Sequence, residues 1–592
     1  MMQKTSIWQS LKQVVSLLNK NKMQFILIAS ILQLAITVIG GNGLNYLFRL
    51  ALISANQTNL NKNNLIELLL NPVSAFMIVV FVLAFAALFF IEISILIYAI
   101  YALQQEKRLS YRGVIRQATA KIKHLIGLDF IYFILYTIVT VPVYGIVMSS
   151  TLTQHLTIPD FITGEFMKSG KGMIGIVVVA LLLIYLNIKL IYAIPAMMIK
   201  NMTLSKSIRY SWNKTKKGKF KFFMTVLLFE LFLGLISVIT LLLCTVPMVF
   251  IDSSGNNLVM QSIFLTLIQF VTFFFSVLSK IGILTLLVSN MSHYVQPDTL
   301  YLTRTEQKRS IMLTAGIIVT ALLAIVGNML ELQDLQLNRN EAIIGHRGYV
   351  KGGVENSLEA LEAAAAQGVQ FVELDILMTK DQQFVVMHDN QLKRLAGIDQ
   401  RVQDMTAAEV VGLPIEQEGF TSKIPSFEEF VQRAKELNVK LLVELKPHGG
   451  EPANYVELFV AKMKELGVET QYRVMSLDLP TILAVEQQAP EMVTGYIIPI
   501  QFGAFERQAV DFFVIEDFSY NSSLAEQAHE MQKELYVWTI NDYAKIVRYL
   551  QLPIDGIISD ELEEVTEAKQ ELAQNTSYYD RVMRLLEFDG VK

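Results

Sequence analysis

Long apolar runs dominate the first 330 residues, and none follows Gln333. Several runs hold about 20 or more mostly apolar residues, the length at which a helix crosses a hydrocarbon layer about 30 Å thick. We therefore expect about seven membrane helices, near residues 23–41, 75–103, 125–149, 173–199, 222–250, 259–294 and 310–330. Two apolar pieces between residues 41 and 72, LNYLFRLALI and LIELLL, are too short to cross and predict interfacial or re-entrant helices.

From Glu341 onward, short β-branched runs alternate with helical segments, as in VQFVELDIL, SFEEFVQRAKELN and VKLLVELKP. This alternation is typical of a parallel α/β fold, and about eight strands in about 220 residues favour a (β/α)8 barrel of the TIM type over an open sheet. The predicted organisation is an all-α multi-span membrane domain over residues 1–335, a barrel over 340–562 and a helical tail over 563–592.

Composition adds little to this division. The net charge of −4 over 592 residues is small and says little about partners, and we expect no nucleic-acid partner. Cys244 is the single cysteine, which excludes an intrachain disulfide. The first 22 residues are polar and basic and precede a span without a small-residue cleavage site, so we expect an interfacial helix rather than a cleaved signal.

Lysine and arginine residues collect in four segments, residues 4–22, 107–123, 200–221 and 304–309. With seven crossings, these segments all fall on one side of the bilayer, and basic loops mark the cytoplasmic side. The pattern predicts a multi-pass protein of the cell membrane with a cytoplasmic N-terminus. Everything after Leu330 would then lie outside the cell.

The expected spans contain five charged residues, Glu92, Asp129, Lys189, Glu230 and Lys280. Charged groups in hydrocarbon are costly and usually face a partner or a wet cavity. The simpler interpretation is two structural acid–base pairs that join Glu92 or Glu230 to Lys189 or Lys280. The alternative is a polar cavity that admits an ion or a substrate head group.

Acidic residues interrupt two of the predicted barrel strands. Side chains two apart on a strand share a face, so Glu373 and Asp375 point the same way, as do Glu444 and Lys446. Inward barrel positions are normally filled by Val, Ile or Leu, and buried carboxylates are costly. A hard divalent cation bound by the three carboxylates would offset this cost, because Ca²⁺ and Mg²⁺ take oxygen ligands.

Two histidines follow predicted strands and would reach the same barrel mouth. His346 ends the first strand and His388 ends QFVVMHD. Either alone would more often be a surface or structural histidine. Together with Arg347, Lys446 and a metal they indicate phosphodiester chemistry, in which cations hold phosphate oxygens and imidazoles move protons.

Gly345 and Gly348 flank the His-Arg pair in this stretch. Glycine permits close backbone approach, so both are candidates for a phosphate-contacting loop. A simple turn is the alternative interpretation.

Six motifs, GHRG, ENS, ELDILMTKDQQFVVMHD, VELKP, VWTIND and DGIISD, occur in the order and approximate spacing of the glycerophosphodiester phosphodiesterase family. The chain resembles that family over roughly residues 342 to 561. The membrane half resembles the membrane-anchored bacterial branch of the family, although this part of the likeness has fewer motifs.

The resemblance implies a role for each matching residue. His346 and His388 would act as general acid and base, with Glu373, Asp375 and Glu444 on Mg²⁺ or Ca²⁺. The substrate-binding residues would be Arg347 and Lys446 on phosphate, Glu355 and Asn356 ordering the site, and Trp538 and Asn541 on the alcohol side. Departures are modest: VENS and KDQQ differ from the usual motifs, and the stretch from Leu392 to Ile424, where related enzymes carry a substrate-facing insertion, is short and unlike theirs.

The resemblance also implies the reaction. A glycerol hydroxyl would attack its own phosphate, and water would open the cyclic intermediate to release glycerol phosphate and an alcohol. The substrate would be a small or lipid-derived phosphodiester. Alternatives are a lysophospholipase D type or teichoic-acid-directed phosphodiesterase or, from another class, a non-catalytic membrane receptor or transporter with a phosphodiester-binding barrel. The oligomeric state stays open.

Overall fold

The computed structural model describes residues 7–57, 59–60, 65–104, 111–122, 128–147, 170–216, 219–291, 307–334, 341–574 and 577–591. The chain falls into two compact units, Met1–Ala51 with Pro72–Gln333, and Leu52–Asn71 with Asp334–Val591. The expected domain junction at residues 335–340 and parts of the basic segments 107–123 and 304–309 lie outside the described residues.

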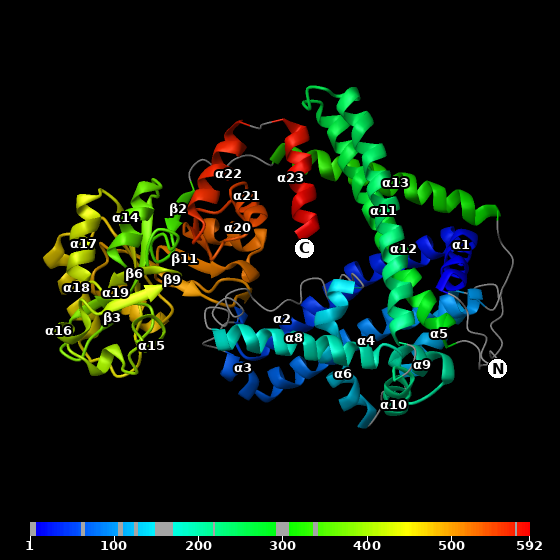
Figure 1. Ribbon diagram of the computed structural model, residues 1–592, viewed down its shortest axis with the longest axis horizontal. Coiled ribbons are helices and arrows are strands. Elements are labelled where there is room, and N and C mark those ends of the chain that lie inside the picture. The colour runs from blue at the N-terminus through cyan, green and yellow to red at the C-terminus, as the bar shows by residue number, and fades with distance from the viewer. Residues whose placement is uncertain are drawn as a thin grey trace. The chain divides into compact units, whose positions relative to one another are not determined.

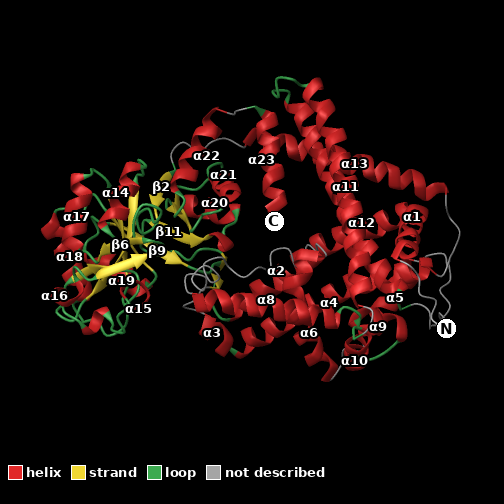
Figure 2. Cartoon of the chain, viewed as in Figure 1, coloured by secondary structure: helices red, strands yellow, loops and turns green. Residues whose placement is uncertain are grey.

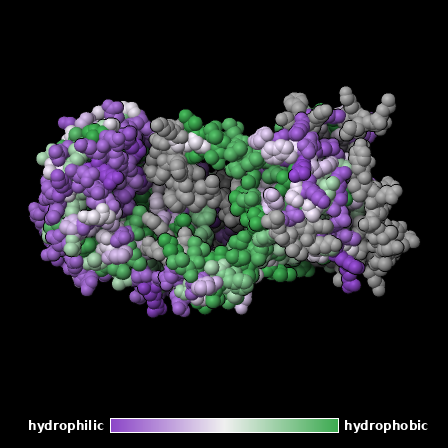
Figure 3. All heavy atoms as spheres, turned by 90° about the horizontal axis from the view of Figure 1, so that it is seen from below, coloured by the Kyte–Doolittle hydropathy of each residue, from purple (hydrophilic) through white to green (hydrophobic). Residues whose placement is uncertain are grey.

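The first unit is helical, and helices make up all its regular structure in the described residues (Figures 1 and 2). Its helices are α1 (Ile7–Ala35), a π-helical turn (Ile36–Gly41), α2 (Asn42–Ser54), α4 (Pro72–Gln104), α5 (Tyr111–Ala120), α6 (Leu128–Val147), α8 (Gly170–Leu190), α9 (Ala193–Lys200), α10 (Leu204–Lys214), α11 (Lys219–Ile251), α12 (Leu258–Ser289) and α13 (Gln307–Asp334). Hydrophobic residues gather on this unit's surface, whereas the barrel unit at the left of Figure 3 is mostly hydrophilic.

Six helical stretches in the described residues are long and apolar enough to cross a membrane: Gln24–Ser54, Pro72–Gln104, Gly172–Lys200, Lys221–Ile251, Leu258–Ser289 and Ala315–Gln333. The seventh predicted span corresponds to α6, which has 20 residues and of which Asp129–Thr140 is the apolar stretch with described side chains. The first span was predicted to end at residue 41, which is wrong. The π-helical turn continues into α2, so LNYLFRLALI extends the first helix and is not a separate interfacial piece.

One of the two predicted acid–base pairs is present in the spans. The Lys280 ammonium lies 2.5 Å from the Glu92 carboxylate, and both side chains are largely buried. Asp129 has a different partner, because its Oδ1 accepts the backbone N–H of Ser205 at 2.7 Å. Pairing of this kind is what makes an ionised group tolerable at membrane depth.

The second predicted pair does not form. Ser279 donates its hydroxyl to the Glu230 carboxylate at 2.9 Å. The Lys189 ammonium lies 5.6 Å from the Tyr185 ring centre and 5.4 Å from that of Trp212, which is cation–π geometry. The sequence could not separate this outcome from an ion pair, because aromatic faces and carboxylates both stabilise a buried ammonium.

The second unit contains a closed barrel of eight parallel strands. The strands are β2 (Ala342–Gly345), β3 (Phe371–Met378), β7 (Lys440–Leu445), β8 (Arg473–Ser476), β9 (Val493–Ile498), β11 (Phe512–Glu516), β12 (Glu534–Trp538) and β13 (Gly556–Ser559). Each pairs with its neighbour, and β13 with β2 and β2 with β3 close the ring. The short β4 (Phe384–Val386) adds to β3 in the antiparallel sense. The predicted barrel is confirmed.

Alternation along the strands sorts side chains between the inside and the outside of the barrel. The interior cluster is apolar in its middle and consists of Ile344, Leu442, Met475, Ile497, Phe512, Val514, Tyr536 and Ile558. At the amino ends of the strands, the Arg473 guanidinium lies 5.2 Å from the Phe371 ring centre and pairs with Glu534. The interior is therefore a filled core, and the cluster of Glu373, Asp375 and Glu444 lies toward the other end of the barrel.

Helices cover the outer face of the barrel: α14 (Leu358–Ala366), α17 (Phe427–Glu436), α18 (Tyr455–Leu466), α19 (Leu479–Gln488), α20 (Ser522–Glu530), α21 (Tyr543–Tyr549) and α22 (Leu562–Gln574), followed by α23 (Tyr578–Val591). Helix α17 begins at a capping box, in which Ser426 and Glu429 satisfy each other's backbone N–H groups. Leu562, Val565 and Leu572 of α22 belong to the barrel core. The segment expected as a tail thus begins inside the helix that follows the last strand.

Residues 392–424 form a small folded insertion with its own hydrophobic cluster. The insertion contains α15 (Lys393–Ala396), a 3₁₀ turn (Val402–Asp404), α16 (Ala407–Val410) and the hairpin β5 (Pro414–Gln417) and β6 (Phe420–Lys423). Leu392, Val402 and Ile415 are buried in it against Val385 and Met387. The insertion is therefore an ordered lobe beside the barrel, although its sequence departs from the usual family pattern.

Candidate active site

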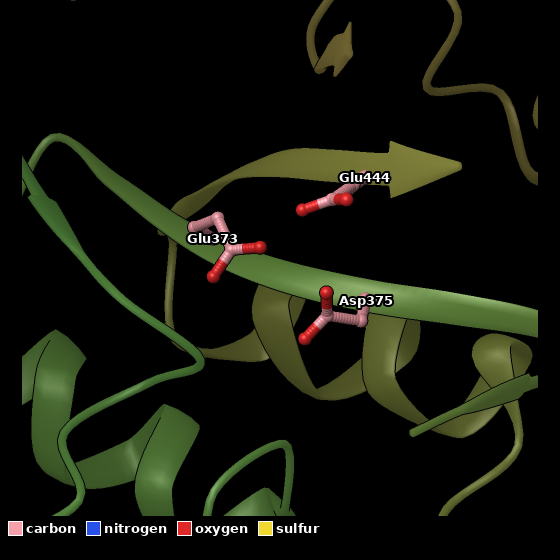
Figure 4. A group of neighbouring side chains, drawn as sticks. All are labelled: Glu373, Asp375 and Glu444. Atoms are coloured by element: carbon pink, nitrogen blue, oxygen red, sulfur yellow. The ribbon is translucent and has the colours of Figure 1, made fainter. Parts of the chain in front are cut away.

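Strands β3 and β7 place three carboxylates at the open end of the barrel. Glu373 and Asp375 share the inward face of β3, and Glu444 lies opposite Asp375 in the parallel register. One carboxylate oxygen from each residue lies within 4.8 Å of the others, and all three residues are buried. In Figure 4 the carboxylates from the two neighbouring strands approach one another.

Asp375 is the most heavily partnered of the three. Its Oδ1 lies 3.2 Å from the Lys446 ammonium, and its Oδ2 lies 3.5 Å from Nε of Arg347. Asn356 donates its amide to Oδ2 at 2.8 Å and accepts the Asp375 backbone N–H at 3.1 Å. This reciprocal pair holds the carboxylate in one orientation.

Arg347 meets the site through both its backbone and its side chain. Its backbone N–H donates to Glu373 at 2.7 Å. Its φ of 55° lies in the left-handed region, and Gly348 follows at 90°. A Cβ on Gly348 would lie 2.7 Å from Cβ of Ala360, so this glycine is needed for packing against α14, and its suggested contact with phosphate stays a prediction.

Close packing also explains why position 345 is a glycine. A Cβ there would lie 2.9 Å from the carbonyl of Gly348 and 3.1 Å from the Leu562 side chain. Both glycines suggested as phosphate contacts are thus accounted for by close packing within the turn.

Glu355 lies at the centre of a buried charge network, with its side chain 2 % exposed. Arg347 donates to its Oε1 at 3.0 Å, and Arg394 donates to both of its oxygens at 2.5 and 2.9 Å. Gln417 donates its amide to Oε2 at 3.0 Å and accepts the Glu355 backbone N–H at 2.9 Å. Two guanidiniums on one carboxylate satisfy its lone pairs, which is the condition for burying it.

His388 follows β4 and lies beside Asp389. Its Nδ1 is 2.6 Å from the Asp389 carboxylate, which also accepts Nε–H of Arg394 at 2.5 Å. Burial, reinforced by the positive charge of Arg347, lowers the pKa of His388. Burial opposes ionisation of Asp389, yet the hydrogen bonds from His388 and Arg394 lower its pKa.

His346 is also held by a carboxylate, that of Asp560, which follows the last barrel strand, β13. Its Nδ1 lies 2.8 Å from the Asp560 carboxylate, whose other oxygen accepts the Asn541 amide at 2.7 Å. Burial opposes ionisation of Asp560, but the His346 imidazole lowers its pKa to about 2. Asn541 also accepts the Asp560 backbone N–H at 2.9 Å, so it contacts the carboxylate that orients His346.

The pKa values of the three clustered carboxylates are shifted in different directions. Burial raises the pKa of Glu373 well above its ordinary value, and the Asp375 and Glu444 charges add to this shift. Burial also raises the pKa of Glu444, to about 7, although the Lys446 ammonium opposes the shift. Burial opposes ionisation of Asp375 too, but Lys446 and His388 lower its pKa well below its ordinary value.

The donor set fits a hard divalent cation. Oε1 of Glu444 is buried and has no hydrogen-bond partner among the described residues. An unpaired buried carboxylate oxygen is expensive, and a cation that coordinates it removes the cost. The same three residues were selected from the sequence, and they form the group of acidic, His or Cys side chains in the described chain that is spaced to hold a metal.

Trp538 lies at the carboxyl end of β12, opposite Glu516 on β11, and its side chain packs against the apolar interior of the barrel. Its position at the end of a strand agrees with a place near the mouth. Its predicted role on the alcohol side of the site stays a prediction.

Sequence reasoning missed three polar residues of the site, Asp389, Asp560 and Arg394. The first directly follows His388, and the second ends the motif DGIISD, so both signals were present. Arg394 lies in the insertion, in the stretch that departs from the family pattern. Only the folded structure brings its guanidinium between Glu355 and Asp389.

Two family models match the chain. "Membrane domain of glycerophosphoryl diester phosphodiesterase" matches residues 11–327, and "Glycerophosphoryl diester phosphodiesterase family" matches residues 346–564. The first match alone spans more than half of the 592 residues. The two matches also divide the chain where the long apolar runs end.

Individual proteins are similar to the barrel half. A glycerophosphodiester phosphodiesterase of Caldanaerobacter subterraneus is 25 % identical over 231 residues, which cover 37 % of this chain and 94 % of that protein. A lysophospholipase D of Rattus norvegicus is 30 % identical over 112 residues, 17 % of this chain and 36 % of that protein. Among solved structures, a phosphodiesterase of Oleispira antarctica in complex with the product sn-glycerol-3-phosphate is 21 % identical, with 39 % of this chain and 96 % of that chain covered and a TM-score of 0.36.

The Arg394→Ala substitution should destabilise the barrel. Removing this guanidinium leaves Glu355 and Asp389 buried with less compensation, and breaking a buried ion pair from one side costs about 3 kcal/mol. The measurement is the free energy of unfolding of the full chain in detergent, obtained by denaturant titration in which proteolysis of the barrel reports the unfolded fraction.

The matched control is Lys393→Ala, because the neighbouring Lys393 side chain is 67 % exposed and pairs with an exposed aspartate, Asp399. Its effect should stay within about 0.5 kcal/mol. Equal stabilities of the two variants would show that the Arg394 network contributes nothing.

Proposed function

The chain belongs to the glycerophosphoryl diester phosphodiesterase family and is a phosphoric diester hydrolase with a membrane domain, and from this premise we propose that its barrel cleaves glycerophosphodiesters by metal-dependent acid–base catalysis. One observation carries the proposal. Two imidazoles, each held by a carboxylate through Nδ1, belong to the same barrel mouth as three clustered carboxylates.

His346 and His388 are the proposed proton carriers. Because Asp560 and Asp389 occupy Nδ1 of each ring, Nε2 is the nitrogen left to exchange protons with substrate. In the first step one imidazole takes the proton of the attacking glycerol hydroxyl, and the other donates a proton to the departing alkoxide. In the second step the former donor takes a proton from water, whose oxygen bonds to phosphorus, and the other imidazole returns its proton to the glycerol oxygen that leaves, so the ring opens to glycerol phosphate.

Arg347 and Lys446 are the proposed phosphate ligands. Their charges flank the Asp375 carboxylate, and Arg347 presents a planar fork suited to phosphate oxygens. A divalent cation, Mg²⁺ or Ca²⁺, on Glu373, Asp375 and Glu444 would add Lewis-acid stabilisation of the phosphoryl oxygens. Glu355 and Asn356 act behind these residues by orienting Arg347 and Asp375.

A lysophospholipid is the second candidate substrate. The lysophospholipase D of Rattus norvegicus is similar to 17 % of this chain, and the attached membrane domain suits a substrate that partitions into the bilayer. We place Trp538 on the alcohol side in both cases. A release assay with glycerophosphocholine and lysophosphatidylcholine in parallel distinguishes the two substrates.

Alanine at His346 or His388 should abolish turnover of glycerophosphocholine while the chain stays folded. Loss of a general acid or base typically lowers kcat by about 10² to 10⁴-fold. The control is His529→Ala, because His529 also pairs with an aspartate, Asp555, but on α20 away from the mouth. Wild-type kcat in either site variant would rule out the assigned proton carriers.

Cation binding should depend on pH through Glu444. The pKa of this carboxyl is raised to about 7, so without metal the folded state favours the protonated form. That contribution to stability is complete below the unfolded pKa of about 4.3 and is lost as the pH rises to about 7.

A divalent cation displaces the proton, so it should stabilise the chain more at pH 8 than at pH 6. The measurement is the unfolding midpoint of the full chain in detergent with Mg²⁺ or with EDTA at both pH values. Glu444→Gln should shrink the difference. The same Mg²⁺ increment at both pH values would contradict the assignment.

We further propose that the barrel faces the outside of the cell and the N-terminus the cytoplasm. The four basic segments fall on one side of the bilayer with seven crossings, which supports this orientation. Protease added to intact cells should release the barrel from the membrane. In sealed inverted vesicles, where an extracellular barrel lies inside, the protease should leave the barrel intact. The reverse pattern would place the barrel in the cytoplasm.

A further inference from the structure

The barrel lacks one covering helix. Every barrel strand except β9 is followed by at least one helix of the outer layer. All of residues 499–511, between β9 and β11, are described, and they contain only the two-residue strand β10 (Phe502–Gly503). The two strands are nevertheless neighbours in the ring (Figure 1), and although α19 packs against β9, the outer groove between β9 and β11 has no helix of its own.

The outer faces of β9 and β11 are apolar and buried. Tyr496 and Ile498 on β9 and Phe513 on β11 are 4 %, 2 % and 1 % exposed. Phe505, from the connecting loop, stacks on Phe513 with ring centres 4.3 Å apart. One aromatic residue of a loop is a smaller cover than the helix found over the other strands.

Residues 52–71, the end of the first membrane span and the loop that connects it to the second, belong to the barrel unit and line a cavity at this gap. Strand β1 (Asn59–Leu60) of this segment pairs in the antiparallel sense with β10, so that Asn59 faces Gly503 and Leu60 faces Phe502. A cavity of about 310 Å³ lies between the two parts. Its lining consists of Ala55, Asn56, Gln57, Asn59 and Glu67 from the segment, with Leu479, Tyr496, Ile498, Glu506, Gln508 and Phe513 from the barrel.

The segment is organised internally. Helix α3 (Leu65–Leu70) buries Leu68 to 1 % exposure. The Asn71 amide donates to the Ser54 carbonyl at 3.1 Å, which joins the two ends of the segment. Gln57 donates its amide to Glu67 at 3.5 Å, which links the part before β1 to α3. These contacts hold the described parts of the segment, residues 52–57, 59–60 and 65–71, together.

The strand that the segment pairs with also belongs to the rim of the catalytic mouth, because the loops after the strands form that rim in such barrels. The backbone N–H of Gln501 donates to the Ser519 hydroxyl at 2.9 Å. The Phe502 ring meets that of Phe518 edge-on, with centres 5.7 Å apart. Fixing β10 therefore fixes the loops after both β9 and β11.

From these observations we propose that the described residues of the loop between the first two membrane spans, 55–57, 59–60 and 65–71, form the missing cover of the barrel and hold its rim in place for substrate binding. The catalytic domain is then discontinuous in sequence, with one piece inserted in the membrane domain. The effect on substrate binding rests on the proposed function, whereas the docking does not.

The proposal restricts the membrane topology. The segment and the barrel can pair only on the same side of the bilayer, so the chain between residues 71 and 334 must cross an even number of times. Five stretches of the described chain in this range are long and apolar enough to cross. Helix α6 must therefore be the sixth crossing.

Cysteine crosslinking tests the docking in native membranes. Opposed residues of an antiparallel pair have Cα atoms about 4.5 to 5.5 Å apart, within disulfide reach. In a Cys244→Ser background, which removes the single native cysteine, Leu60→Cys with Phe502→Cys should form a disulfide. The Asn59 and Gly503 positions are avoided, since Gly503 has a φ of 91°.

A protease site inserted between residues 335 and 340 separates the two halves of the chain unless the disulfide joins them. The matched control pairs Leu60→Cys with Phe420→Cys, because Phe420 is also exposed but lies on β6, whose partner is β5. The docking is supported if only the Leu60–Phe502 cysteine pair forms a disulfide that keeps the cleaved halves together. If neither pair forms a disulfide, or if both form one equally, the docking is overturned whether or not the enzyme is active.

Kinetics test the effect on the rim. Asn59→Pro with Leu60→Pro removes both backbone donors of β1 and should raise KM for the diester about fivefold with kcat nearly unchanged. Ile66→Ala, at an exposed position of α3 in the same segment, should leave KM unaltered.

Locking the segment with the disulfide gives a second kinetic measurement that does not need the proline variant to fold. The crosslinked chain should keep the KM of its reduced form within about twofold. A KM unchanged by the prolines in a folded chain, or a large rise on crosslinking, would overturn the positioning role.

Discussion

The burial of three carboxylates at one end of a barrel is the constraint around which the catalytic half is organised. Glu373, Asp375 and Glu444 lie where inward positions are normally apolar, and their oxygens approach within 4.8 Å. Charges of like sign at this distance in a buried site are costly. The positive charges of Arg347 and Lys446 beside Asp375 offset part of this cost. A metal ion bound by the three carboxylates would offset the rest.

The remaining polar residues orient these groups. Asp560 and Asp389 hold the two imidazoles, and Arg394 joins the second of them to Glu355. Through this network the insertion at residues 392–424 contributes a charge to the site as well as a lobe beside it. A change in the insertion that displaced Arg394 would therefore disturb the surroundings of His388 and Arg347 and the stability of the fold together.

The membrane half follows the same rule of compensation in a more apolar setting. Its charged residues within the spans are few: Glu92 and Lys280 form an ion pair, Glu230 accepts a hydroxyl, Asp129 accepts a backbone N–H, and Lys189 lies over aromatic faces. The loop between its first two spans contributes polar and apolar groups to the barrel unit. The boundary between the two family matches in the sequence therefore differs from the boundary between the two folded units.

Periodicity and residue type determined much of this protein from the sequence alone. Apolar runs of membrane-spanning length, strand and helix alternation, and paired acids two residues apart are local signals, and they predicted the spans, the barrel and the convergence of Glu373, Asp375 and Glu444. The tertiary structure decided which groups meet across long sequence separations. The Glu92 partner, the bridge made by Arg394 and the pairing of β1 with β10 depend on three-dimensional packing, because several partners of equal chemistry were available and only proximity in the fold selects one.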